Sequence, residues 1–103
     1  MHKRTKALQI PMHVKRIVAE RDSWDGWPCC ILCGSPNAAC NAHVVPRSAG
    51  GRGIPENVIT LCQDCHRELD QGGNRKELAQ KVRDYLVSVY PGWDEGDLIY
   101  RKN

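Results

Sequence analysis

Phenylalanine is absent from this chain of 103 residues, and aromatic residues make up only 6% of it. No apolar run approaches the ~20 residues that a membrane-spanning helix needs, so we expect no contact with a membrane. The basic start of the chain reaches Pro11 before an apolar segment of signal-peptide length is complete, which argues against secretion. A reduced, cytoplasmic setting is therefore expected. So short a chain, with a mean hydropathy of −0.54, predicts one domain whose modest core needs a further source of stability.

Cysteines are the first candidate for that source. In a reduced chain, cysteines at short paired spacings predict a metal site rather than disulfides. Cys30 and Cys33 form one C-x-x-C pair, Cys62 and Cys65 form a second, and 28 residues separate the pairs. Two such pairs are typical of a structural zinc ion that is held by four thiolates.

The register of the first pair has an alternative, because Cys29 adjoins Cys30 and could pair with Cys33 instead. Gly34 directly follows Cys33 and favours Cys30, since a glycine there suits the tight turn that aims backbone amides at a bound sulfur. Cys29 and Cys40 are then expected to be plain, partly buried thiols.

Positive charge is concentrated at the start of the chain. Residues 1 to 21 hold six Lys and Arg against one Glu, whereas the formal net charge of the whole chain is only +3. A basic arm over residues 1 to 10 suits the phosphate backbone of a nucleic acid. The alternative is a solvated charged tail without a partner.

Proline and glycine divide the first third of the chain. Pro11 fits the first turn of a helix that ends near Asp22. The turn-rich connection after it contains Trp24 and Trp27, which are expected to cap the core. The predicted buried side of the helix consists of Met12, Ile17 and Val18, with Val14 as a further candidate.

Two β-branched segments predict a hairpin, with strands over 41–45 and 58–61 and a glycine-rich loop between them. A short helix over 64–69 and a long helix over 74–90 follow. The tail from 93 to 100 is expected to pack back on the domain. Apolar residues at helical spacing give the long helix its predicted core face, which consists of Leu78, Val82, Tyr85, Leu86 and Val89.

The hairpin and short helix carry a specific series of signals. His43 precedes two valines and Pro46, Gly50-Gly51 follows, Asn57 precedes an apolar strand, and His66 directly follows the second C-x-x-C pair. Over residues 21 to 72 this series resembles the HNH endonuclease family, specifically its small zinc-stabilised type from phages and prophages. The resemblance implies an α+β fold with a ββα-metal core. The single domain 1–103 would then comprise a flexible arm 1–10, a core 29–72 and a C-terminal helix 74–90.

The resemblance also implies roles for individual residues. His43 corresponds to the general base that activates the attacking water. Asn57 corresponds to the middle residue of the motif, which either fixes the base by hydrogen bonds or meets the metal. His66 corresponds to a ligand of a catalytic Mg²⁺ or Mn²⁺, and Asp70 lies one helical turn further on the same face. Ala42 departs from the family, which often has Asp or His there as a metal ligand.

The implied activity is metal-assisted hydrolysis of double-stranded DNA. Arg47, Arg52 and Arg67 are candidate phosphate contacts, together with the N-terminal arm. A homodimer, or association with a larger phage-type enzyme, is the expected assembly. Ala42 keeps a rival open, which is a non-catalytic zinc module that binds nucleic acid, and RNA is an alternative substrate.

Overall fold

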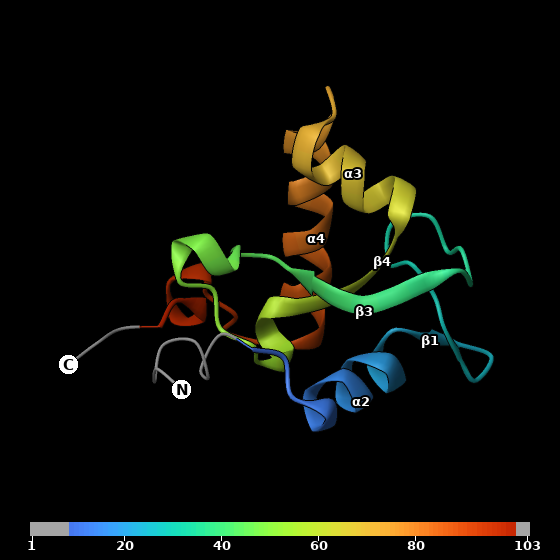
Figure 1. Ribbon diagram of the computed structural model, residues 1–103, viewed down its shortest axis with the longest axis horizontal. Coiled ribbons are helices and arrows are strands. Elements are labelled where there is room, and N and C mark those ends of the chain that lie inside the picture. The colour runs from blue at the N-terminus through green and yellow to red at the C-terminus, as the bar shows by residue number, and fades with distance from the viewer. Residues whose placement is uncertain (1–8, 101–103) are drawn as a thin grey trace.

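The computed structural model describes residues 9–100, so most of the predicted basic arm, residues 1–8, lies outside the described part. Three α-helices lie within this range (Figure 1): α2 (Met12–Arg21), α3 (Gln63–Gln71) and α4 (Arg75–Val89). They accompany two small antiparallel sheets, which confirms the predicted α+β class. None of the helices in this range is long and apolar enough to cross a membrane.

The main hairpin pairs β3 (Ala38–His43) with β4 (Val58–Cys62). The sequence predicts the first strand over 41–45, but the strand begins earlier and ends at His43. It begins earlier because pairing with the end of β4 recruits two alanines, whose own strand preference is weak. Beyond His43 the amide of Val44 still donates to the carbonyl of Asn57, at 2.9 Å. The next amide, that of Val45, donates to the side chain of Asn57 instead, at 2.8 Å, and the strand pairing stops there.

A second, very short hairpin joins β1 (Ser23–Trp24) to β2 (Trp27–Pro28). Its two-residue turn places Asp25 and Gly26 at φ values of 53° and 81°, as a tight hairpin turn requires. Trp24 is 79% exposed and Trp27 is 61% exposed. The prediction that these tryptophans cap the core is therefore wrong, because they pair with each other across a hairpin too short to bring them over it.

Strand β4 is the centre of the core, since all five of its residues are buried. Ile59 and Leu61 pack with Val82 and Leu86 of α4 in one cluster. Val58 packs with α2 in a second cluster. The strand therefore lies between α2 and α4, as Figure 1 shows.

The predicted core faces of the outer helices are partly correct. In α2 the buried residues are Val14 and Val18, which are one turn apart. Met12 and Ile17 are 66% and 45% exposed, so their predicted burial is wrong. In α4 the prediction holds for Val82 and Leu86, which are buried against β4. It fails for the exposed Val89, which lies in the last turn of the helix.

The C-terminal segment packs back on the domain as predicted. Its 3₁₀ helix η3 (Glu95–Leu98) buries Leu98. The Trp93 indole donates to the carbonyl of Glu56 at 2.8 Å, and the amide of Tyr100 donates to the carbonyl of Gly50 at 2.7 Å. This segment therefore braces the loop between β3 and β4.

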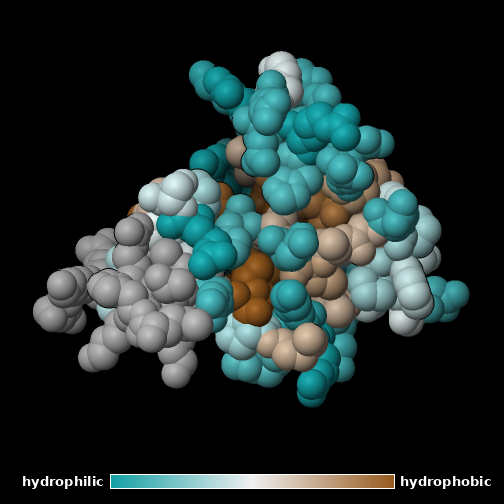
Figure 2. Space-filling model, viewed as in Figure 1, coloured by the Kyte–Doolittle hydropathy of each residue, from teal (hydrophilic) through white to brown (hydrophobic). Residues whose placement is uncertain are grey.

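Hydrophilic side chains gather over α3 at the top of the view in Figure 2, consistent with a helix that buries none of its residues.

Candidate functional site

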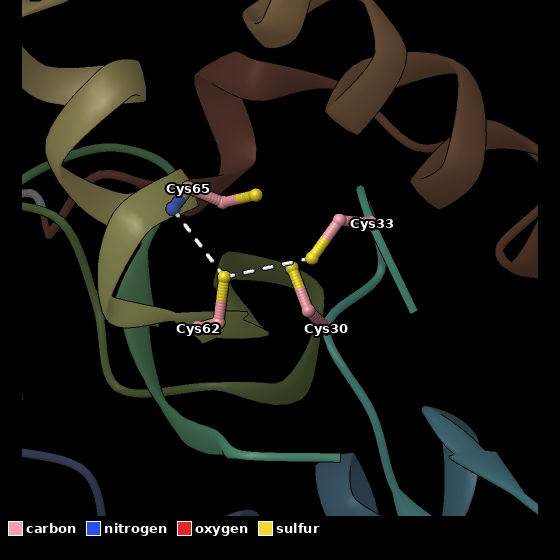
Figure 3. Close-up of side chains that lie close together, drawn as sticks. All are labelled: Cys30, Cys33, Cys62 and Cys65. Atoms are coloured by element: carbon pink, nitrogen blue, oxygen red, sulfur yellow. Dashed lines mark hydrogen bonds between the residues drawn. The ribbon is translucent and has the colours of Figure 1, made fainter. Parts of the chain in front are cut away.

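Four cysteine sulfurs lie together between two segments that are distant in the sequence (Figure 3). Cys30 and Cys33 follow β2, Cys62 ends β4, and Cys65 lies in the first turn of α3. All four Sγ atoms are within 4.8 Å of one another, and those of Cys33 and Cys62 are 3.6 Å apart. Tetrahedral zinc with Zn–S bonds of ~2.3 Å separates its sulfurs by about 3.8 Å. The cluster therefore fits a structural zinc ion.

The backbone around the cluster has the geometry of a metal-binding turn. The amide of Gly34 donates to the carbonyl of Cys30 at 2.8 Å, and Gly34 has a φ of 80°, which favours glycine. The amide of Cys65 donates to the sulfur of Cys62 at 3.4 Å. Cys29 instead directs its thiol at the carbonyl of Trp27, at 3.3 Å. The structure thus selects Cys30 over Cys29.

The thiols of the cluster differ in acidity. Burial acts to raise the pKa of Cys30, but backbone amides, those of Cys62 and Cys33 first, outweigh it and lower that pKa to about 7. Burial and the neighbouring sulfurs raise the pKa of Cys65. The Cys30 thiol thus loses its proton readily, whereas its neighbour Cys65 resists becoming a second thiolate. A bound cation relieves this repulsion, which is the chemistry that zinc supplies.

His66 and Asp70 lie on α3, and His43 is the last residue of β3. His66 Nε2 lies 3.5 Å from Asp70 Oδ2, with the two side chains 43% and 62% exposed. Asp70 and His43 line one pocket of about 180 Å³, whose apolar wall includes Leu69 and Val82. Asp70 thus lies on the same pocket as His43 and beside His66, whereas His66 is not among the residues that line the pocket. Within residues 9–100, the four cysteines are the only group of three or more His, Cys, Asp or Glu side chains whose ligand atoms lie close enough to share one metal ion.

Asn57 is fully buried at the end of the 3₁₀ helix η2 (Pro55–Asn57). Its Oδ1 accepts from the amide of Val45 at 2.8 Å. Its Nδ2 donates to the carbonyls of Val45, at 3.2 Å, and Arg52, at 2.8 Å. Of the two roles that the sequence left open, this geometry favours holding the loop after His43 over meeting a metal ion.

The glycine pair belongs to the same arrangement. Gly50 has a φ of 87°, a conformation that glycine adopts without strain. A Cβ on Gly51 would lie 1.7 Å from the carbonyl oxygen of Val45. No side chain fits at this position. The glycine therefore allows the loop to pack against Val45, whose backbone Asn57 holds.

Ala42 is 1% exposed and belongs to the core cluster that contains Ile59, Val82 and Leu86. Its methyl group packs and cannot ligate. The candidate metal ligands that remain in the motif are His66 and Asp70, one nitrogen and one oxygen donor.

None of the three arginines predicted to contact phosphate lines this pocket. Arg47 is exposed in the 3₁₀ helix η1 (Arg47–Ala49). Arg67 is exposed and lies 4.0 Å from Asp64. Arg52 is half-buried, and its amide donates to the carbonyl of Leu98 at 2.8 Å. The arginine that does line the pocket is Arg83 of α4, which the motif could not identify because this part of α4 lies beyond it.

A buried ion pair is not evident from the sequence. Arg21 donates to both carboxylate oxygens of Asp22, at 2.7 and 2.9 Å, and to the carbonyls of Pro55 and Val58, each at 2.7 Å. Asp22 Oδ2 accepts from the amide of Thr60 at 3.0 Å. The pair thereby fixes the segment that carries Asn57 against α2.

Two tyrosines at the C-terminal end of α4 enclose this ion pair. The Arg21 guanidinium carbon lies 5.6 Å from the centre of the Tyr85 ring and 5.8 Å from that of Tyr90. The Tyr85 hydroxyl donates to Asp22. Burial, and then the bond to Asp22, raise the pKa of Tyr85 to about 12. An Arg-Asp pair at a helix end carries no sequence signal that distinguishes it from surface charges.

Comparison with known proteins places these residues in context. A sequence model described as HNH endonuclease matches residues 30–80. A stretch of 40 residues is 47% identical to the type IV methyl-directed restriction enzyme EcoKMcrA of Escherichia coli K12, and covers 39% of this chain and 14% of that protein. A stretch of 44 residues is 36% identical to anaredoxin of a Nostoc species, and covers 42% of this chain and 58% of that protein. The chain thus spans less than two thirds of either relative.

Proposed function

The chain belongs to the HNH endonuclease family, and we propose that it is a metal-dependent endonuclease that hydrolyses phosphodiester bonds in DNA. The observation that carries this proposal is the shared position of His43 and Asp70 on one pocket, with Asp70 beside His66. A base and a metal-binding pair in this proximity are the groups that metal-assisted phosphodiester hydrolysis requires.

In this proposal His43 accepts a proton from the water that attacks the phosphorus atom. Asn57 acts as a positioning residue, because its side chain holds the backbone two residues after His43. His66 and Asp70 would hold a Mg²⁺ or Mn²⁺ ion, which supplies positive charge to the phosphate and the departing oxygen. The products would carry 5′-phosphate and 3′-hydroxyl ends, as in the family.

The four cysteines serve stability in this proposal. They join the turn after β2 to the start of α3, and a zinc ion there would fix α3 relative to the hairpin. Since α3 carries His66 and Asp70, the structural ion would also hold the candidate catalytic groups in place.

Double-stranded DNA is the proposed substrate. Arg47, Arg52 and Arg67, with the basic arm, would contact its phosphates. One centre cuts one strand, so a homodimer, or association with a larger phage-type enzyme, would be needed to cut both. A cytoplasmic location, where thiols stay reduced, completes the proposal.

A plasmid assay tests this function. Nicking or linearisation should require Mg²⁺ or Mn²⁺ and should be lost in His43→Ala. The matched control is His13→Ala, since His13 is exposed on α2 and outside the pocket. Equal cleavage by the two variants would refute His43 as the base.

Burial of Ala42 favours a second candidate, a zinc module that binds nucleic acid without cutting it. Salt-dependent binding of DNA without cleavage under any divalent ion would support this candidate. Parallel assays on RNA would show whether RNA is the substrate instead.

A further inference from the structure

Two charged side chains outside the family motif line the pocket that contains His43 and Asp70. Arg83 comes from the middle of α4, and Glu95 begins η3. Arg83 Nε lies 3.3 Å from Glu95 Oε1, with the two side chains 42% and 48% exposed. The C-terminal segment therefore places the Glu95 carboxylate against the Arg83 guanidinium at the candidate active site.

This ion pair contributes little to stability, because pairs this exposed are screened by water and salt. Arginine offers five N–H donors in a planar fork, and the contact described for this guanidinium occupies one of them. The remaining donors suit a phosphate, which arginine binds through two parallel hydrogen bonds.

The size of the pocket restricts what it can hold. At about 180 Å³ it is smaller than the ~300 Å³ at which small-molecule sites begin. It suits a single group that projects from a larger molecule rather than a whole cofactor. His43 and Asp70 in the same lining indicate a phosphodiester as that group.

On the basis of the proposed function, we infer that Arg83 binds the phosphate of the substrate in this pocket and that Glu95 occupies its guanidinium until DNA arrives. A phosphate oxygen then replaces the Glu95 carboxylate. The exchange is favourable because the exposed ion pair is weak and each phosphate contact also releases a counterion from DNA. Arg83 thereby supplies positive charge at a centre where Ala42 provides no metal ligand.

Binding of a short DNA duplex at a series of salt concentrations tests this inference. Arg83→Gln should reduce the slope of log K against log salt by about 1. Lys81→Gln is the matched control, since Lys81 is exposed on the same helix and outside the pocket. Glu95→Gln should bind DNA roughly two- to fivefold more tightly, because the competing carboxylate is gone.

Cleavage gives the second measurement. Arg83→Gln should lower kcat by about 10- to 100-fold, and Arg83→Lys should retain part of the activity because it keeps the charge but not the fork. Thermal unfolding of each variant checks that it folds. If Arg83→Gln fails to fold, Glu95→Gln remains a test, and weaker or unchanged binding by that variant would overturn the inference.

The failures of the two proposals differ. If the wild type cleaves DNA and Arg83→Gln matches Lys81→Gln in salt slope and rate, the inference about Arg83 is wrong and the proposed function stands. If the wild type does not cleave but Arg83→Gln still reduces the salt slope, the endonuclease proposal fails and the phosphate contact stands.

Discussion

Replacement of Arg21 by methionine tests the buried ion pair most directly. The substitution removes the guanidinium that donates to both oxygens of Asp22. The side chain of Asp22 is completely buried and that of Arg21 is 8% exposed. A carboxylate in this position has little access to water that could replace its partner.

The expected cost follows from that burial. Removing one partner of a buried ion pair costs about 3–5 kcal/mol. Asp22 would keep its bonds from Thr60 and Tyr85, but the carbonyls of Pro55 and Val58 would lose the Arg21 donor. We therefore expect a cost of at least ~3 kcal/mol. With a urea m-value of about 1–3 kcal/mol/M, the unfolding midpoint should fall by roughly 1–3 M.

Urea unfolding at a fixed zinc concentration measures this change, because a bound metal itself adds to stability. Arg16→Met is the control, since Arg16 is exposed on the same helix and should change stability by less than about 0.5 kcal/mol. The double variant Arg21→Met with Asp22→Asn should be more stable than Arg21→Met alone, because the uncompensated charge is gone. If Arg21→Met costs no more than Arg16→Met, the reasoning about this pair is refuted.

Three further predictions concern the metal cluster, the loop and the tyrosine. Cys62→Ser should lose the bound zinc, measured by metal analysis, and should unfold. Cys40→Ser should keep both the zinc and the fold. A folded, metal-free Cys62→Ser protein would contradict the structural role of the zinc. Asn57→Ala should lower stability by about 3 kcal/mol, at ~1 kcal/mol for each of three hydrogen bonds, and should reduce cleavage; unchanged cleavage would argue against a positioning role. The pKa of Tyr85 is raised to about 12 by burial and by Asp22, so the unfolded chain loses this proton first as pH rises above ~10. The stability that Tyr85 contributes is thus present below pH ~10 and is lost towards pH ~12, and the difference in urea midpoint between wild type and Tyr85→Phe should shrink over that range.

The parts of the fold that can be predicted are those with short-range causes. The helices can be placed within a few residues because Pro11, Gly72 and the apolar spacing of α4 act locally. The ends of β3 cannot be placed in this way, because its pairing with β4 and the side chain of Asn57 decide where the ladder begins and stops.

The sequence by itself determined the two cysteine pairs, except for the choice between Cys29 and Cys30, which the structure decided. It also determined the order of the family motif. Both depend on residue spacing within short segments, where the geometry of a turn leaves few alternatives. Burial of Ala42 and of the Arg21–Asp22 pair, exposure of the two tryptophans, and the meeting of His43, Asp70, Arg83 and Glu95 were decided only by the tertiary structure. These features depend on how β4, α4 and the C-terminal segment pack, and that packing joins residues whose separation in the sequence carries no signal of contact.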